Sequence, residues 1–280
     1  MPSAPEHAAR LTMFDLDAYL ERIGLSGRPG IAEVHRAHVT SIPFENLDPQ
    51  RGVPVSLELD DVQRKLVAEG RGGYCFEHNT LLGAALEALG AEVEPMLGRV
   101  GPRELDTRAR SHLVLRVKED GEVWHADVGY GAGTLLDPVP FGAGGPYQQS
   151  GWHFRVVADA GRLVLQARGH DGEWADEYSF TPEPAPFVDL ETSNWFTCTH
   201  PRSHFVRGLV VAANAADGIR TVLSDWSGTL RLMEQAPAGE TVTTPERSAV
   251  PELLATRFGL PGWELDPGGR LARIEDSPAQ

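Results

Sequence analysis

The spacing of apolar residues changes near residue 91, and this change constrains the fold more than any other feature of the chain. Up to that point apolar residues recur at three- and four-residue intervals, which is typical of amphipathic helices. The clearest case, CFEHNTLLGAALEALG at residues 75–90, ends at a glycine, a common helix stop. Beyond residue 91, short apolar or alternating runs are separated by turn residues, as in antiparallel strands. The pattern predicts an α+β protein.

Three segments follow from these patterns. Residues 1–90 are expected to form a small helical bundle, because amphipathic patterns follow one another there with short connections. Residues 91–200 predict an antiparallel sheet or barrel. Residues 201–280 predict a mixed α/β segment with a helix over residues 251–258.

Local patterns make finer predictions. Asp60 followed by Gln63 is typical of a capping box, so a helix is expected to start at Asp60. Apolar and β-branched residues at 205–213 predict a strand. The glycine-rich stretch at 141–151 predicts a long turn.

The formal net charge of −15 repels phosphate backbones and anionic lipid, so neither nucleic acid nor a membrane surface is an expected partner. No apolar run approaches the roughly 18 residues that cross a bilayer. The N-terminal residues also lack the basic and apolar parts of a secretory leader. Because the chain has only two cysteines, we expect free thiols and a cytoplasmic location.

Cys75 lies in the run RGGYCFEHN at residues 71–79, where a glycine-rich loop meets a helical pattern. A helix start offers partial positive charge and unpaired N–H groups, which favour a thiolate nucleophile and an oxyanion. Two other interpretations stay open at this point. Cys75 and His78 could form a zinc site with Cys198 and His200, or Cys75 could be a buried structural residue.

The other polar residues of this run have local roles in either case. A carboxylate disfavours a nearby thiolate, so Glu77 opposes the nucleophile interpretation. We expect Glu77 and Asn79 to bond within the turn, with Arg71 as a candidate charge partner for Glu77. If His78 is not a metal ligand, it is expected to be a helix-surface or packing residue.

A cysteine nucleophile needs a histidine base and a third group that orients the histidine. The runs at 111–117 and 122–129 predict strands joined by the turn KEDG. A four-residue loop would place His112 directly opposite Asp127, and a two-residue loop would place it diagonally on the same face. A three-residue loop would separate them. His125 shares the face of Asp127 on its own strand and stays a rival to the favoured His112.

Five motifs then occur in one order: SIPFENLD (41–48), RGGYCFEHN (71–79), SHLVLRV (111–117), HADVGYG (125–131) and THPRSHFV (199–206). With these motifs the chain resembles the arylamine N-acetyltransferase family. The resemblance implies a three-domain arrangement over the three segments above: a helical bundle, an antiparallel β-barrel and an α/β lid. It also implies a cysteine-protease-like Cys-His-Asp triad.

The resemblance assigns the triad to Cys75, His112 and Asp127, and it selects His112 over His125. It implies ping-pong transfer of an acetyl group from acetyl-CoA to aromatic amines, hydrazines or N-hydroxyarylamines through an acetyl-cysteine intermediate. Acetyl-CoA is then a cosubstrate, and neither a tightly bound cofactor nor a metal is expected.

Aromatic and glycine residues are expected at the substrate. Phe44, Phe76 and Phe205 are candidate walls of an apolar cleft that protects the thioester from water, with Phe44 the first choice. Gly129 belongs to the run VGYGAG, where missing side chains could let the CoA pyrophosphate approach the backbone. The family more often has Phe where this chain has Tyr130, and Ser or Thr where it has Cys198.

The alternative within the same fold is an amide synthase that releases a longer acyl chain onto an aryl amine in secondary metabolism. A peptidase or transglutaminase-like enzyme would use the same Cys-His-Asp order on peptides. A zinc or binding module would leave Cys75 unreactive. The sequence leaves the oligomeric state open.

Overall fold

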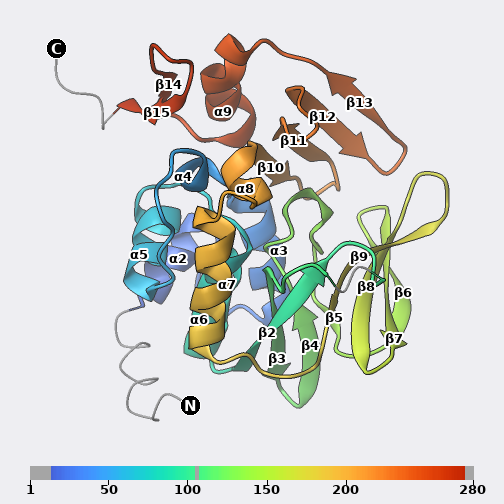
Figure 1. The fold of residues 1–280 in the computed structure, drawn as a ribbon. Helices are drawn as coiled ribbons and strands as arrows, with labels where there is room; N and C mark the ends of the chain where they lie inside the picture. The colour runs from blue at the N-terminus through green and yellow to red at the C-terminus, as the bar shows by residue number, and fades with distance from the viewer. Residues whose placement is uncertain (1–13, 105–106, 275–280) are drawn as a thin grey trace.

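The computed structural model describes residues 14–104 and 107–274, so the outer ends of the predicted first and third segments lie outside the described residues. The N-terminal part is helical, as its period predicts (Figure 1). Its elements are α2 (Leu16–Arg22), α3 (Ile31–Ser41), α4 (Leu47–Gln50), α5 (Leu59–Gln63), the π-helical turn η1 (Arg64–Ala68) and α6 (Cys75–Leu89). Gly90 ends α6 in the left-handed conformation, which glycine adopts without steric cost.

The capping box predicted at Asp60 is wrong. Helix α5 begins one residue earlier, and its N-cap residue Glu58 makes no side-chain cap hydrogen bond. Gln63 Oε1 instead accepts the backbone N–H of Asp15 at 3.0 Å, at the start of α2. A contact between two helices has replaced the local cap.

The middle of the chain forms the barrel, an eight-stranded antiparallel sheet in the order β5-β4-β3-β2-β9-β8-β7-β6. Its elements are β2 (Glu92–Val100), β3 (His112–Glu119), β4 (Glu122–Ala126), the 3-10 turn η2 (Gly131–Gly133), β5 (Val139–Pro140), β6 (Gly144–Gln149), β7 (Trp152–Asp159), β8 (Arg162–Arg168) and β9 (Trp174–Phe180). The change of period near residue 91 marks the start of β2. The long turn predicted at 141–151 is wrong in part, because β6 pairs with β7 despite its glycines.

The C-terminal part contains a five-stranded sheet in the order β1-β10-β11-β12-β13. The remaining elements are α7 (Phe187–Thr199), α8 (His204–Arg207), β10 (Val210–Asn214), β11 (Arg220–Ser224), β12 (Arg231–Ala236), β13 (Gly239–Thr243), η3 (Arg247–Ala249), α9 (Val250–Phe258), β14 (Trp263–Leu265) and β15 (Leu271–Arg273). Helix α9 confirms the prediction at 251–258. The strand predicted at 205–213 is wrong in its first half, which forms part of the short helix α8.

A short strand joins the first and third parts of the chain. Strand β1 (Phe44–Glu45) pairs antiparallel with β10, and Phe44 also bridges to Gly73 in the loop before α6. The C-terminal sheet is thus anchored beside the start of α6, where Cys75 lies. The domain boundaries drawn from the sequence stay a prediction.

The largest apolar core holds α6 against the barrel strand β3. Phe76, Leu82 and Leu86 are buried on α6, as their helical spacing predicts, and Leu89 is half-buried. Burial of this face fixes the helix on the barrel and brings its first residue to the junction. None of the described helices is long and apolar enough to cross a bilayer.

Candidate active site

Cys75 is the first residue of α6, and the preceding loop holds it there. The Glu77 carboxylate accepts the backbone N–H of Tyr74 at 3.1 Å, which closes the first helical turn. A Cβ at Gly73 would lie 2.7 Å from Glu77 Oε2, so the turn has room only for glycine. The buried Cys75 sulfur lies 3.6 Å from the carbonyl oxygen of Ser111.

The hairpin of β3 and β4 carries the two partners of the cysteine. Its two-residue turn consists of Asp120 and Gly121, whose positive φ angles of 51° and 85° are those of a type I′ turn. This register places His112 diagonal to Asp127 on one face. The register predicted for a two-residue loop is confirmed, and the directly opposed register is wrong.

His112 and Asp127 form a buried ion pair, with His112 Nε2 2.8 Å from Asp127 Oδ2. Burial alone would lower the pKa of His112, but the charge and hydrogen bond of Asp127, together with Cys75, raise it to about 10. Burial would raise the pKa of Asp127, yet His112 holds it well below its usual range. His112 is therefore a cation at neutral pH. Because Nε2 bonds Asp127, Nδ1 is the ring nitrogen left for Cys75.

Asp127 is itself held by residues from two helices. Asn79 Nδ2 and the backbone N–H of Gly129 each donate to Asp127 Oδ1 at 2.9 Å. The backbone N–H of Asp127 donates to His35 Nε2 at 3.1 Å, and burial lowers the pKa of His35 to about 4, so the ring is neutral. The local role predicted for Asn79 is wrong. Its spacing of four residues from Cys75, one helical turn, was the available signal, whereas no local pattern pointed to His35.

His125 takes no part in this ion pair. Its Nε2 lies 2.9 Å from the hydroxyl oxygen of Tyr178, and burial lowers its pKa to about 4. The Tyr178 ring also packs on His112, with ring centroids 4.6 Å apart. The geometry thus brings His112, rather than its rival, to Asp127.

Gly129 lies directly against the start of α6. A Cβ at Gly129 would be 2.6 Å from the Cα of Cys75, so the close approach of two backbones accounts for the glycine. The Phe44 and Phe205 rings lie 6.1 Å apart between centroids, and Phe205 lies 5.4 Å from the ring of Tyr74. Three parts of the chain therefore bring aromatic rings to the loop before the cysteine. The contact of Gly129, Phe44 and Phe205 with substrates stays a prediction.

A cavity of about 390 Å³ reaches Ser111, whose carbonyl oxygen lies 3.6 Å from the Cys75 sulfur. Its lining includes the apolar side chains of Leu97 on β2 and Phe196 on α7. The other lining side chains are mostly polar, and Cys75 is not among them. The volume lies within the range of small-molecule sites.

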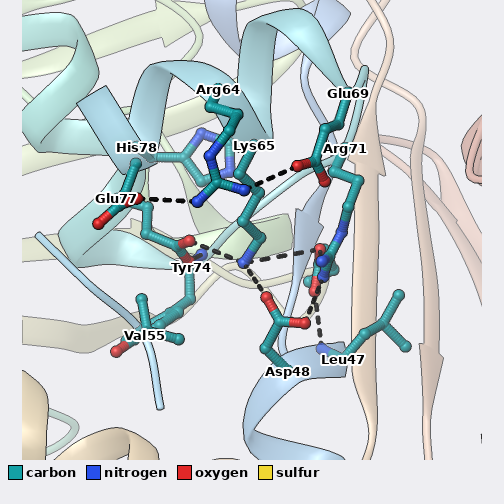
Figure 2. A network of polar contacts seen from close by, with 12 residues as sticks. Leu47, Asp48, Val55, Arg64, Lys65, Glu69, Arg71, Tyr74, Glu77 and His78 are labelled. Atoms are coloured by element: carbon teal, nitrogen blue, oxygen red, sulfur yellow. Dashed lines mark hydrogen bonds and ion pairs between the residues drawn. The ribbon is translucent and has the colours of Figure 1, made fainter. Parts of the chain in front are cut away.

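A network of buried charges lies beside the same helix start (Figure 2). Glu77 Oε1 accepts the Lys65 ammonium group at 2.7 Å. Arg71 instead contacts Glu45 at 2.8 Å and Asp48 at 2.9 Å. The predicted Arg71–Glu77 pair is therefore wrong. Sequence reasoning missed Lys65, Glu45 and Asp48, because they come from separate segments that only the fold brings together.

His78 and Cys198 do not meet as metal ligands. Buried His78 donates from Nε2 to the Pro43 carbonyl oxygen at 3.2 Å, so its Nδ1 accepts from His38 Nε2 at 2.8 Å. The Cys198 thiol lies 3.8 Å from the carbonyl oxygen of Trp195. In residues 14–104 and 107–274, no three His, Cys, Asp or Glu side chains are grouped to hold a metal ion.

Comparison with known proteins agrees with this geometry. The N-acetyltransferase family model matches residues 30–262, and the arylamine N-acetyltransferase of Mycolicibacterium smegmatis is 40% identical over 279 residues. That alignment covers 94% of this chain and 99% of the relative. The chain belongs to the arylamine N-acetyltransferase family. It is an acyltransferase.

Solved structures of this family share the fold. The Mycobacterium marinum arylamine N-acetyltransferase, solved in complex with CoA, superimposes with a TM-score of 0.82 at 38% identity. The match covers 88% of this chain and 93% of that one. A proansamycin X synthase of Amycolatopsis mediterranei is 32% identical, over 64% of this chain and 72% of that protein. The M. smegmatis arylamine N-acetyltransferase thus matches more of the chain at higher identity.

Proposed function

We propose that this enzyme transfers an acetyl group from acetyl-CoA to aromatic amines, hydrazines or N-hydroxyarylamines, with Cys75, His112 and Asp127 as its catalytic triad. The observation that carries the proposal is the buried His112–Asp127 ion pair beside a cysteine at a helix start. The relatives named arylamine N-acetyltransferase, one of them solved with CoA, support the donor and the acceptor class.

The first half-reaction loads the enzyme. The Cys75 thiolate, stabilised by the His112 cation and the start of α6, attacks the thioester carbonyl of acetyl-CoA. Backbone N–H groups at the helix start stabilise the oxyanion. The bond from the acetyl carbon to the CoA sulfur breaks, and the leaving CoA thiolate takes a proton from His112.

The second half-reaction unloads it. An aromatic amine is weakly basic and neutral at pH 7, so its nitrogen attacks the acetyl group on Cys75. His112, now neutral, accepts the amine proton as general base while the Cys75 sulfur leaves. This step restores the thiolate and the imidazolium. Asp127 stays ionised throughout and keeps the His112 ring oriented.

The acetyl-enzyme must survive until the amine arrives, which requires an apolar surrounding that excludes water. Phe44 and Phe205 are the proposed walls, because their rings pack at the loop before Cys75. Gly129 is proposed to lie at the substrate because its backbone touches Cys75. Two free thiols suit a reducing compartment, which supports a cytoplasmic location.

The test separates loading from release. Incubation with acetyl-CoA and no amine is expected to add one acetyl group, detected by intact mass spectrometry, and addition of aniline is expected to remove it. Cys75→Ala should abolish the adduct, whereas Cys198→Ser, the matched control at the other thiol, should keep it. An adduct that persists in Cys75→Ala would refute the assignment. Faster loading from a long-chain acyl thioester than from acetyl-CoA would favour the amide synthase alternative.

A further inference from the structure

A carboxylate beside a thiolate nucleophile is an electrostatic disadvantage, and Glu77 places one there. Glu77 lies two residues after Cys75 on α6, about 3 Å further along the helix axis. The Glu77 carboxylate lies 3.1 Å from the backbone N–H of Tyr74, the residue before Cys75, and negative charge at this turn opposes ionisation of the thiol. The same carboxylate accepts the backbone N–H of Tyr74 and fits against Gly73, so it also holds the turn that delivers Cys75. The turn needs the Glu77 carboxylate as a hydrogen-bond acceptor, whereas ionisation of Cys75 is favoured when the charge of that carboxylate is cancelled.

Lys65 supplies the opposite charge. Its ammonium nitrogen lies 2.7 Å from Glu77 Oε1 and 2.8 Å from Asp48 Oδ2, and Lys65 and Glu77 are only 8% and 1% exposed. Figure 2 shows this group at the centre of the contacts. Such buried pairs are screened far less than surface pairs. Lys65 is also one of two lysines among the 25 Lys and Arg residues of the chain.

The local backbone is unusual at the same place. Lys65 lies in the π-helical turn η1, which continues α5. Wide turns of this kind are rare and frequently occur at functional sites. The compact ammonium group reaches two carboxylates there, Glu77 and Asp48, as a point charge.

The other two carboxylates of the network, Glu45 and Asp48, share a second cation, Arg71. The ionisable groups that face Glu77 are Lys65 on η1, Glu45 on β1 and Asp48 on α4, with the Cys198 thiol and the Tyr74 phenol nearby. The Tyr74 phenol in turn interacts with the Cys75 thiol. Arg71 pairs with Glu45 and Asp48. Removal of the Lys65 and Glu77 charges together therefore leaves Glu45 and Asp48 with a cation. Burial raises the pKa of Glu77 to about 7, with the charge of Lys65 opposing the rise.

We propose that Glu77 and Lys65 are a pair of positioning residues for the nucleophile. Glu77 holds the turn that places Cys75 at the start of α6, and Lys65 cancels the negative charge that Glu77 brings to that turn. The pair contacts neither the Cys75 sulfur nor the acetyl group that is transferred, and it acts by placing Cys75. The proposal rests on the proposed function only in taking Cys75 as the nucleophile.

The test is the pH dependence of iodoacetamide alkylation at Cys75 in the full chain, with the Cys75 and Cys198 peptides resolved by mass spectrometry. Glu77→Gln keeps an acceptor for the Tyr74 N–H but removes one negative charge from the network, while Lys65 keeps its contact with Asp48. The midpoint of the Cys75 profile should therefore move down by about one pH unit. The double variant Glu77→Gln/Lys65→Met should return it to the wild-type midpoint. Damage to the fold would instead slow alkylation in both variants.

A third variant separates the turn from the charge. Glu77→Ala removes the acceptor as well, so alkylation should slow at least tenfold across the pH range, while Glu77→Gln retains the rate. The matched control is the exposed pair of Lys118 and Glu92, which has the same 2.7 Å contact. Glu92→Gln and Glu92→Gln/Lys118→Met should leave the profile unchanged.

Each outcome decides the proposal. An unshifted or raised midpoint in Glu77→Gln overturns it, even if the double variant does not fold. A double variant that matches Glu77→Gln shows that Lys65 does not act on the sulfur and also overturns it. The proposed function fails separately if His112→Gln, in the otherwise unchanged chain, leaves the rate of Cys75 alkylation the same as in the wild type. Alkylation needs neither acetyl-CoA nor amine, so the two failures are distinguishable.

Discussion

At the scale of single residues, one charge sets the ionisation of the base. The Asp127 carboxylate opposes the effect of burial and raises the pKa of His112 to about 10. Asp127→Asn should therefore lower that pKa, and kcat/KM for aniline acetylation should fall roughly a thousandfold. In Asp127→Asn, the His112 ring should also lose its proton at a lower pH, so the pH above which His112→Gln no longer changes the rate of Cys75 alkylation should fall. Asp171→Asn, at an exposed loop residue, is the control, and a loss of less than tenfold in Asp127→Asn would contradict the triad.

At the scale of elements, two glycines differ in how closely they approach their neighbours: Gly129, which lies against the start of α6, and Gly83, which lies inside that helix. A Cβ at Gly129 would strike the backbone of Cys75 at 2.6 Å, whereas one at Gly83, inside α6, would meet Val93 at an ordinary 3.5 Å. Gly129→Ala should destabilise the fold by about 2 kcal/mol or more and abolish most activity. Gly83→Ala should stabilise it by about 0.5–1 kcal/mol with activity kept. Urea unfolding and acetylation assays check both, and equal stability of the two variants would refute the close-approach argument.

The elements also show where sequence reasoning holds. Helix α6 and the β3–β4 hairpin were predictable, because a buried helix face and a Asp-Gly turn are local patterns. Strand β6 and helix α8 were not. β6 forms because a neighbouring strand satisfies its backbone despite its glycines, and α8 interrupts a run whose apolar residues suit a strand.

At the scale of the whole molecule, buried neutral histidines make stability depend on pH. Burial lowers the pKa of His35, His78 and His125 to about 4 and holds that of His38 well below its usual value. These rings stay neutral in the folded state while the unfolded chain protonates below about pH 6.5, so stability is lost as pH falls from about 6.5 towards 4. Glu77, whose folded pKa is raised to about 7, offsets part of the loss, since it gains a proton on folding in this range.

The expected result is a fall of several kcal/mol in the free energy of unfolding between pH 7.5 and pH 5. Urea denaturation at the two pH values measures it, with the midpoint lower at pH 5. The Asp127 pKa lies below this window and contributes nothing to the change. A chain that is equally stable or more stable at pH 5 would show that the buried rings are protonated when folded.

The sequence by itself determined the class of fold and the nucleophile candidate, and it left a few registers for His112 and Asp127, from which the structure selected the diagonal one. Each depends on residues close in the chain: a change of hydrophobic period, a nine-residue motif and a hairpin with few possible registers. The tertiary structure alone decided what surrounds them. Lys65, His35 and the pairing of β1 with β10 join segments far apart in sequence. Local patterns carry no information about such contacts, because burial and charge act through space rather than along the chain.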